Sequence, residues 1–252
     1  MNEQPLVSII TPSYNAENYI EETIKTVLNQ SYTNWEMIIC DDCSRDRTVE
    51  IVEQYAKQDP RVKLIKLTEN SGAAVTRNTA INNSSGRFIA FLDADDQWVP
   101  DKLTRQISFM LEKDVGFSFT GYEVMDDLGK STEKVVQVPE KVNYQYLLKN
   151  TIIGCLTVVL DREKVGEVQM PLYRTRQDFA LWLSILKKGH IAYGLNEVLA
   201  RYRKTAGSIS RNKVKAAKQN WIIYRKHEKL SLLPALWYFV NYAWNGYMKN
   251  RD

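Results

Sequence analysis

Short apolar runs alternate with amphipathic segments along the first half of the chain. Residues 7–10, 35–39, 62–67 and 88–92 are apolar runs with the length of buried strands. Between and after them, apolar residues recur at helical spacing at 20–28, 51–56, 73–83 and 100–111, and Pro100 suits the first turn of the last of these helices. This alternation predicts an α/β fold with a mainly parallel sheet and helices on both faces.

The pattern is less regular after residue 124. Residues 125–150 predict a loop, a short strand and a helix. Residues 157–160 then predict a strand, and residues 179–186 one face of a helix. From residue 211 we expect two helical segments broken near Pro234.

Polar clusters follow three of the four predicted strands. They are Thr11/Ser13/Tyr14/Asn15, Asp41/Asp42 and Asp93/Asp95/Asp96. In a parallel α/β sheet ligands bind beyond the carboxyl ends of the strands, where these clusters would meet. Two acidic clusters at one edge repel each other unless a cation or donor groups offset them. A divalent metal is the simplest compensation.

Asp93-Ala94-Asp95 is the strongest candidate for such a metal site. From an extended backbone the two carboxylates can point the same way. Hard carboxylate oxygens suit Mg²⁺ or Mn²⁺, which keep open positions for phosphate oxygens. A metal there would neutralise a pyrophosphate leaving group. An isolated D-x-D motif is weak support, and its place after an apolar strand makes it more specific.

Charge is unevenly distributed along the chain. The net charge is +4, but residues 201–252 carry 12 Lys and Arg against 2 Asp and Glu, a local balance of +10 that leaves −6 for residues 1–200. Six aromatic residues lie in the same tail: Trp237, Tyr238, Phe239, Tyr242, Trp244 and Tyr247. Basic and aromatic residues together favour contact with an anionic membrane. A solvated helix face, or packing on the catalytic part or a second subunit, is the alternative.

Other functions find little support. Cys40, Cys43 and Cys155 are too few for a disulfide framework, and the single C-x-x-C pair lacks a second pair for zinc. The N-terminus does not resemble a signal peptide, and no apolar run reaches about 18 residues. A cytoplasmic protein is therefore expected. His190 and His227 lack a metal-ligand pattern, and only the basic tail suggests nucleic acid, which we do not expect as a partner.

Five motifs in order resemble the family-2 glycosyltransferases of the GT-A fold. They are VSIITPSYN at 7–15, WEMIICDD at 35–42 with Ser44, Asn70-Ser71-Gly72 with Arg77-Asn78, FLDADD at 91–96, and Gln177-Asp178 with Leu181-Trp182. The resemblance covers about residues 6–190. It is strongest to glycosyltransferases of teichuronic acid and capsular polysaccharide biosynthesis in bacteria. The family usually has Glu-Asp where this chain has Gln177-Asp178, which puts a secondary acceptor contact in doubt.

The resemblance implies a role for each matching residue. Thr11, Pro12, Tyr14, Asp42, Arg77, Asp93 and Ala94 would bind the nucleotide. Within this set Tyr14 would stack on a uracil, Asp42 would accept a hydrogen bond from the base, and Arg77 would approach the diphosphate. Asp95, with Asp93, would hold Mn²⁺ or Mg²⁺. Asp178 would be the general base.

Each assignment has a structural alternative. Tyr14 could cap the sheet edge, Asp42 could be a turn residue, and Arg77 could pair with a surface carboxylate. Asp178 could be an acid favoured by a helix N-terminus. Asp41 is better explained as a turn residue, and Asp96 as a helix cap or a support for its neighbours.

The resemblance also implies the domain organisation and the reaction. We expect a GT-A catalytic domain at 1–205, with a nucleotide-binding half at 1–98 and an acceptor-binding half at 99–205. A basic and aromatic helical region would follow at 206–252. The expected activity is inverting transfer from a UDP-sugar to a glycan or undecaprenyl-linked acceptor, at the inner face of the plasma membrane. The alternatives are a nucleotidyltransferase, which would normally show a Gly-rich first loop, and a non-catalytic nucleotide-sugar-binding subunit.

Overall fold

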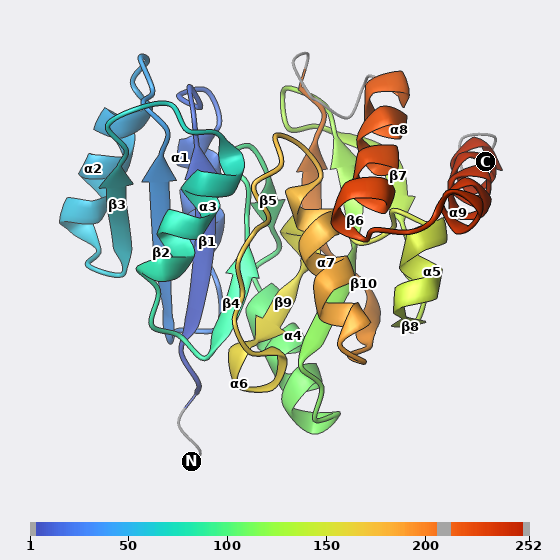
Figure 1. The fold of residues 1–252 in the computed structure, drawn as a ribbon. Coiled ribbons are helices and arrows are strands. Elements are labelled where there is room, and N and C mark those ends of the chain that lie inside the picture. The colour runs from blue at the N-terminus through green and yellow to red at the C-terminus, as the bar shows by residue number, and fades with distance from the viewer. Residues whose placement is uncertain (1–3, 206–212, 249–252) are drawn as a thin grey trace.

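The computed structural model describes residues 4–205 and 213–248. Ten strands of this part of the chain form one mixed sheet, whose main path runs β3-β2-β1-β4-β9-β6-β10-β5 (Figure 1). The strands are β1 (Val7–Ser13), β2 (Trp35–Asp41), β3 (Val62–Lys66), β4 (Phe88–Phe91), β5 (Gln97–Trp98), β6 (Phe117–Met125), β7 (Ser131–Val136), β8 (Lys141–Val142), β9 (Val159–Asp161) and β10 (Ala192–Arg203). β7 pairs with β6, and β8 with β10.

Helices cover both faces of this sheet. They are α1 (Ile20–Leu28), α2 (Thr48–Gln58), α3 (Ala73–Asn82), α4 (Lys102–Glu112), α5 (Tyr144–Lys149), α6 (Arg162–Val165), α7 (Gln177–Lys187), α8 (Lys213–Ile222) and α9 (Leu232–Met248), with a 3₁₀ turn η1 (Cys155–Thr157) and a π-helical turn η3 (Ile223–His227). One core lies under α1, α2 and α4, and the other under α3, α5, α7 and the C-terminal helices. The predicted fold class is confirmed.

The first four predicted strands are confirmed as one parallel group. β1 pairs in parallel with β2 and β4, and β2 with β3. All seven residues of β2 and all four of β4 are buried, because helices cover both faces of these strands. Such strands read as continuous apolar runs in the sequence, and this is why they were predictable. Their carboxyl ends share one edge of the sheet.

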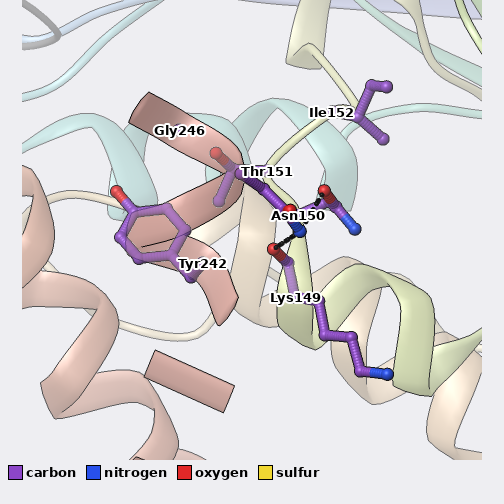
Figure 2. Close-up of a pocket in the computed structure, with 7 residues that line it drawn as sticks. Lys149, Asn150, Thr151, Ile152, Tyr242 and Gly246 are labelled. Atoms are coloured by element: carbon purple, nitrogen blue, oxygen red, sulfur yellow. Dashed lines mark hydrogen bonds between the residues drawn. The ribbon is translucent and has the colours of Figure 1, made fainter. Parts of the chain in front are cut away.

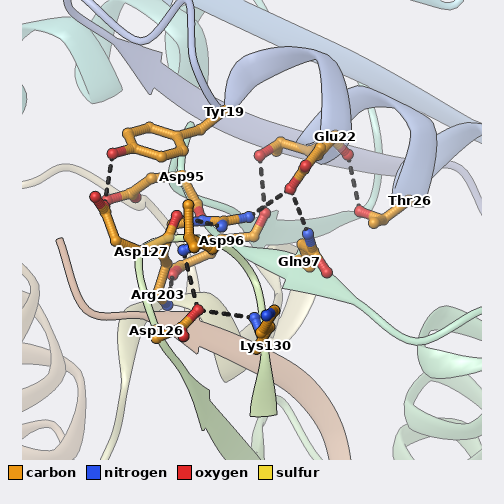
Figure 3. A network of polar contacts seen from close by, with 12 residues as sticks. Tyr19, Glu22, Thr26, Asp95, Asp96, Gln97, Asp126, Asp127, Lys130 and Arg203 are labelled. Atoms are coloured by element: carbon orange, nitrogen blue, oxygen red, sulfur yellow. Dashed lines mark hydrogen bonds and ion pairs between the residues drawn. The ribbon is translucent and has the colours of Figure 1, made fainter. Parts of the chain in front are cut away.

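β10 is a twelve-residue strand that the sequence pattern did not predict. It runs parallel to β6 but shifts register twice between Leu195 and Ala200. Each shift changes which side chains face the core, so the alternation of buried and exposed residues is lost. The strand ends at Arg203, on the same side of the sheet as the acidic residues that follow β4 (Figure 3).

The C-terminal helices pack on the rest of the molecule through one side. Ile223, Tyr224 and Ala235 are fully buried in a core that also contains Trp182 of α7. The Tyr224 hydroxyl donates a hydrogen bond of 2.5 Å to the Leu148 carbonyl. In the described ranges, no helix is both long enough and apolar enough to cross a bilayer.

The predicted break near Pro234 lies slightly earlier in the chain. Residues 228–231 separate η3 from α9, and Lys229 has a left-handed φ of 54°. Pro234 lies inside the first turn of α9, where a helix needs no N–H donor from proline. Residues 211 and 212, which we expected to be helical, lie outside the described residues.

Candidate active site

Asp41 organises the turn that follows β2. Its carboxylate accepts hydrogen bonds from the Ser13 hydroxyl at 3.0 Å and from the Ser44 N–H at 2.8 Å. The Ser44 hydroxyl also donates to Asp41 at 2.5 Å and accepts from the Asn15 N–H at 2.8 Å. Asp41 therefore joins the loops after β1 and β2, which agrees with its expected role as a turn residue.

Asp42 is buried beside the start of α3. The Ser71 N–H donates to Asp42 Oδ1 at 2.7 Å, and the Gly72 N–H donates to Oδ2 at 2.9 Å. Gly72 has a φ of 82°, a conformation that glycine adopts without strain. Backbone donors thus offset the charge of Asp42. Of the two expected ways to offset an acidic cluster, a cation or donor groups, the Asp41/Asp42 pair uses donor groups of the chain.

Thr11, Pro12 and Tyr14 lie at the end of β1. Thr11 is fully buried, and its hydroxyl has no hydrogen-bond partner among the described residues. Pro12 lies opposite Cys40 in the register of β1 and β2. The ring of Tyr14 is 52% exposed, so it is free to meet a ligand from solvent.

The acidic turn, residues 93–96, follows β4. On one side of it Arg77 of α3 donates to Asp93 Oδ1 at 2.5 Å. Arg77 is 6% exposed, and its Nε has no partner among the described atoms. Burial alone would lower the pKa of Arg77, but the negative charge of Asp93 raises it above the ordinary value. Arg77 is therefore a buried cation that pairs with Asp93, a carboxylate of the acidic turn that is 34% exposed.

On the other side of the acidic turn lies Arg203, the last residue of β10. Its backbone N–H donates to Asp96 Oδ1 at 2.9 Å, and its Nε donates to the Asp95 carbonyl at 2.8 Å (Figure 3). Its remaining guanidinium nitrogens bind the Asp127 carbonyl at 3.0 Å and the Glu22 carboxylate at 2.6 Å. Arg203 is 2% exposed. Sequence reasoning missed this residue.

Burial and like charge dominate the electrostatics of the acidic turn. Burial and the neighbouring Asp93 raise the pKa of Asp95 to about 6, although Arg203 and Arg77 act in the opposite direction. Burial also raises the pKa of Asp96 well above its ordinary value, and Asp95 and Asp93 add to this effect. Two guanidinium groups therefore do not fully compensate three carboxylates. A further cation at this turn would stabilise the ionised forms.

The fit of a divalent metal depends on Asp95. Among the described residues, its carboxylate makes no ion pair and no hydrogen bond to another residue, whereas Asp93 is paired with Arg77 and Asp96 with the Arg203 N–H. Nowhere in the described ranges do three or more His, Cys, Asp or Glu side chains form a metal cage. This donor set fits Mg²⁺ or Mn²⁺ that takes its other ligands from phosphate and water.

Asp178 lies in the first turn of α7, two residues after Arg176, whose φ of 66° is left-handed. It is half-buried and close enough to Arg77 to raise the pKa of that guanidinium. Burial raises the pKa of the Cys155 thiol, and Asp93 and Asp178 add to this effect while Arg77 opposes it. Asp178 thus lies within electrostatic reach of the acidic turn.

Gln177 is buried beside Asp178, and its Oε1 has no partner among the described atoms. The neighbouring Thr175 hydroxyl is likewise unpartnered. Together with Thr11 and Arg77, the candidate site therefore contains four buried polar groups that nothing in the described chain satisfies. Such groups are uncommon in folded proteins, and a bound ligand is one way to satisfy them.

A separate small pocket lies between α5 and α9 (Figure 2). Its lining residues are Lys149, Asn150, Thr151, Ile152, Tyr242, Asn245 and Gly246. None of them is a predicted nucleotide, metal or base residue. This pocket is therefore distinct from the candidate active site.

The chain resembles bacterial glycosyltransferases over nearly its whole length. It is 56% identical over 248 residues, 98% of each chain, to TuaG of Bacillus subtilis (strain 168), which is named as a glycosyltransferase of teichuronic acid biosynthesis. It is 43% identical over 97% of its length, and 95% of the relative's, to WfgD of Escherichia coli, named UDP-Glc:alpha-D-GlcNAc-diphosphoundecaprenol beta-1,3-glucosyltransferase.

Solved structures of lower identity share the fold. Residues 1–349 of Staphylococcus aureus TarS, in complex with UDP-GlcNAc, align over 95% of this chain and 72% of that one, with a TM-score of 0.70 and 18% identity. The mannosyltransferase PcManGT of Pyrobaculum calidifontis, in complex with GDP-Man and Mn²⁺, aligns over 96% and 74%, with a TM-score of 0.69 and 20% identity. The fold is GT-A.

The acidic turn, both loops at the ends of β1 and β2, and the buried Arg77 all lie within residues 8–166. This segment matches the family described as Glycosyl transferase family 2. The order of the five motifs, the GT-A fold and this match agree, and the chain is a glycosyltransferase that belongs to family 2.

Proposed function

We propose that this protein is a metal-dependent inverting glycosyltransferase. It would move a sugar from a UDP-sugar to a hydroxyl of a cell-envelope polysaccharide or lipid-linked glycan precursor. The observation that carries the proposal is the Asp95 carboxylate, which lies in a turn held by the buried Arg77 and Arg203 and makes no ion pair or hydrogen bond to another of the described residues. The E. coli relative, whose name includes a UDP-Glc donor and a diphosphoundecaprenol acceptor, supports the choice of substrates.

The nucleotide would bind where the strands end. Tyr14 is exposed and can stack on a base, and the Thr11 hydroxyl, which has no partner among the described residues, would hydrogen-bond to the nucleoside. Pro12, Asp42 and Ala94 would complete this pocket. Two backbone N–H groups hold the Asp42 carboxylate, and its remaining lone pairs would accept a hydrogen bond from the base. Arg77 would bind the diphosphate through its forked donors.

Mn²⁺ or Mg²⁺ would be held by Asp95, with Asp93 as its neighbour. When bound, the metal supplies positive charge that stabilises the leaving diphosphate. The raised pKa of Asp95 agrees with this role, because it reflects uncompensated negative charge at the turn. Arg203 would position the turn by holding the Asp95 carbonyl and the Asp96 carboxylate.

Asp178 would act as the general base. Its carboxylate would accept the proton of the acceptor hydroxyl while that oxygen attacks the anomeric carbon of the donor sugar. The new glycosidic bond forms on the face opposite the leaving UDP, and the bond to the UDP oxygen breaks. A single displacement of this kind inverts the anomeric configuration.

The setting of the reaction follows from the same proposal. Residues 1–98 would bind the donor and residues 99–205 the acceptor, with residues 206–252 as a helical extension. The protein would act in the cytoplasm, at the inner face of the plasma membrane, with peripheral contact through this extension. The charge of the extension and the diphosphoundecaprenol acceptor in a relative's name support this location.

A donor panel tests the proposal. Release of UDP would be measured from UDP-glucose, UDP-galactose, UDP-GlcNAc, UDP-GalNAc and UDP-glucuronate, with Mn²⁺ and with EDTA. We expect release from one donor that EDTA and Asp95→Asn abolish, while the matched surface variant Asp101→Asn retains it. If no donor releases UDP, and calorimetry also finds no binding of UDP and Mn²⁺, the UDP-sugar donor is rejected. Binding without turnover on any acceptor would favour a non-catalytic subunit.

A further inference from the structure

Helix α9 presents an apolar face to the outside of the molecule. Leu233, Val240 and Trp244 are 78%, 63% and 62% exposed. The exposed large apolar residues of this helix are Leu232, Leu233, Leu236, Trp237, Val240, Trp244 and Met248, which recur at spacings of three and four. We call them the outer face of α9. They form one continuous stripe along the helix.

The opposite side of α9 holds the helix on the protein. Ala235 is fully buried, and the Phe239 ring lies 5.5 Å from the Trp221 ring of α8. The Asn245 side chain donates to the Lys149 carbonyl at 3.2 Å and to Asn150 Oδ1 at 3.0 Å, beside the pocket of Figure 2. These contacts fix the rotation of α9 about its axis, so the outer face cannot turn inward.

A surface helix normally has polar residues on the side that faces away from the core. α9 has no Asp, Glu, Lys or Arg among its seventeen residues. Apolar patches of this extent on a folded chain mark an interaction surface. The exposed fractions of the outer face therefore mark it as a surface for interaction with another molecule.

The charges around α9 identify the chemistry of that partner. Arg225, Lys226 and Lys229 are exposed in the segment just before the helix. The Lys149 ammonium lies 4.4 Å from the centre of the Trp237 ring on the outer face. A second copy joined through the same face would bring these cations together, because a two-fold interface repeats one patch on both sides. An anionic lipid surface would instead neutralise them.

We infer that the outer face of α9 docks onto an anionic bilayer, with the helix lying in the plane of the interface. Trp237 and Trp244 suit the boundary between headgroups and acyl chains, and Leu233 and Val240 would enter its apolar side. Seventeen helical residues reach about 25 Å, and α9 does not qualify as a spanning helix. This inference rests on the peripheral membrane contact proposed above, but not on the identity of donor or acceptor.

Co-sedimentation of the full chain with vesicles tests the inference. The vesicles are phosphatidylcholine alone, or with about 30% phosphatidylglycerol. We expect binding to the anionic vesicles and at least a ~10-fold loss of that binding in the double variant Val240→Asp/Trp244→Asp. The control is Leu111→Asp, which introduces one of the two added carboxylates at a 45% exposed position of α4 and should bind as the native chain does. Lys226→Glu/Lys229→Glu should remove the preference for anionic lipid.

The other outcomes overturn the inference. These are an absence of binding of the native chain to either vesicle, or equal binding by the double variant. If the native chain sediments as a dimer that Val240→Asp separates, and no vesicle binding occurs, the outer face is a contact between copies. Calorimetric binding of UDP and Mn²⁺ is measured on every variant. Unchanged values show that a loss of docking is separate from any failure of the donor site.

Discussion

The acidic turn and the outer face of α9 both depart from the usual distribution of side chains. The turn buries charged residues, and the outer face exposes apolar ones. At the turn, Arg203, Asp96 and Arg77 are 2%, 2% and 6% exposed although all three carry ionisable groups. On α9, Val240 and Trp244 are more than 60% exposed although both are apolar. Folded proteins normally bury apolar groups and expose charged ones. Each region therefore indicates a partner, a polar one at the turn and an apolar one at the helix.

The two regions differ in how the chain supports them. Arg203 holds the acidic turn, the Asp127 loop and Glu22 of α1 together, so three distant segments depend on it. The outer face of α9 is mostly exposed, and the helix is held mainly from its other side, through Ala235, Phe239 and Asn245. Substitutions at the turn should therefore change activity and stability, whereas those on the outer face should change binding alone.

The largest effect is expected at Asp178. Asp178→Asn keeps the shape of the side chain but cannot accept the proton, and we expect kcat to fall by about 10²–10⁴. Binding of UDP and Mn²⁺ should be unchanged, because the substitution acts only on the acceptor proton. Initial rates and calorimetry would measure the two quantities. A variant with a native kcat would exclude Asp178 as the base and leave it as a helix N-terminal acid.

The next effect concerns stability at the acidic turn. Arg203→Met removes the guanidinium that donates to the Asp95 and Asp127 carbonyls and pairs with the half-exposed Glu22, and we expect the free energy of unfolding to fall by about 1–3 kcal/mol. The matched control is Arg201→Met on the same strand, where a half-exposed guanidinium pairs with Glu123 at 3.3 Å. That loss should stay below about 1 kcal/mol. Urea denaturation of both would compare them, and equal losses would contradict a special role for Arg203.

Lys102 lies outside the candidate active site and shows how burial without an opposite charge nearby changes the pKa of an amine. Lys102 is fully buried, with its ammonium beside Gln106 Oε1 and 4.8 Å from the Trp98 ring, and burial lowers its pKa to about 7. Between pH 7 and about 10.4 the unfolded chain binds the proton and the folded chain does not, so folding stability rises with pH.

Lys102→Met should remove this dependence. From pH 7 to pH 9 the native chain should gain about 2 kcal/mol relative to the variant, at about 1.4 kcal/mol per pH unit. Denaturation at several pH values measures the gain. Lys113→Met, at an exposed position just after α4, is the control and should follow the native chain. Parallel pH profiles for the native chain and Lys102→Met would show that Lys102 stays charged when buried.

The smallest effect is expected on the outer face of α9. Leu233→Gln and Trp244→Gln should each change the free energy of unfolding by less than about 0.5 kcal/mol, because both side chains already face solvent. Phe239→Ala on the inner side should cost about 1–3 kcal/mol. If the outer substitutions proved as costly as the inner one, the outer face would be packed in the folded protein, and the contrast with the acidic turn would disappear.

The sequence predicted those parts of the molecule that depend on local patterns. Strands β1 to β4 are short segments rich in apolar residues, so their positions and the polar residues after β1, β2 and β4 could be read directly. The family match, the GT-A fold and the glycosyltransferase activity are also confirmed. The individual roles of Tyr14, Asp95 and Asp178 stay predictions, because neither the fold nor the relatives test them.

The parts that were missed depend on contacts between distant residues. Two register shifts disrupt the alternation of apolar and polar residues along β10. The sequence pattern therefore predicted neither this strand nor the position of Arg203 at its end. The backbone donors to Asp42 belong to Ser71 and Gly72, about thirty residues later in the chain. The sequence around Asp42 therefore could not predict them. The sequence predicted a break near Pro234, and the break lies at residues 228–231. The first turn of a helix accepts proline, so Pro234 alone does not fix the exact position of the break.

The position of Arg203 in the chain also has a consequence for biosynthesis. Its contacts to Asp96 and Glu22 span 107 and 181 residues. A ribosome therefore releases β1 to β4 and the acidic turn well before it releases Arg203, which holds that turn. Domains form progressively during translation, and long-range pairings form last. Until β10 joins the sheet, Arg77 should thus be the guanidinium that offsets the acidic turn, so that the candidate active site is completed by the last described strand of the chain.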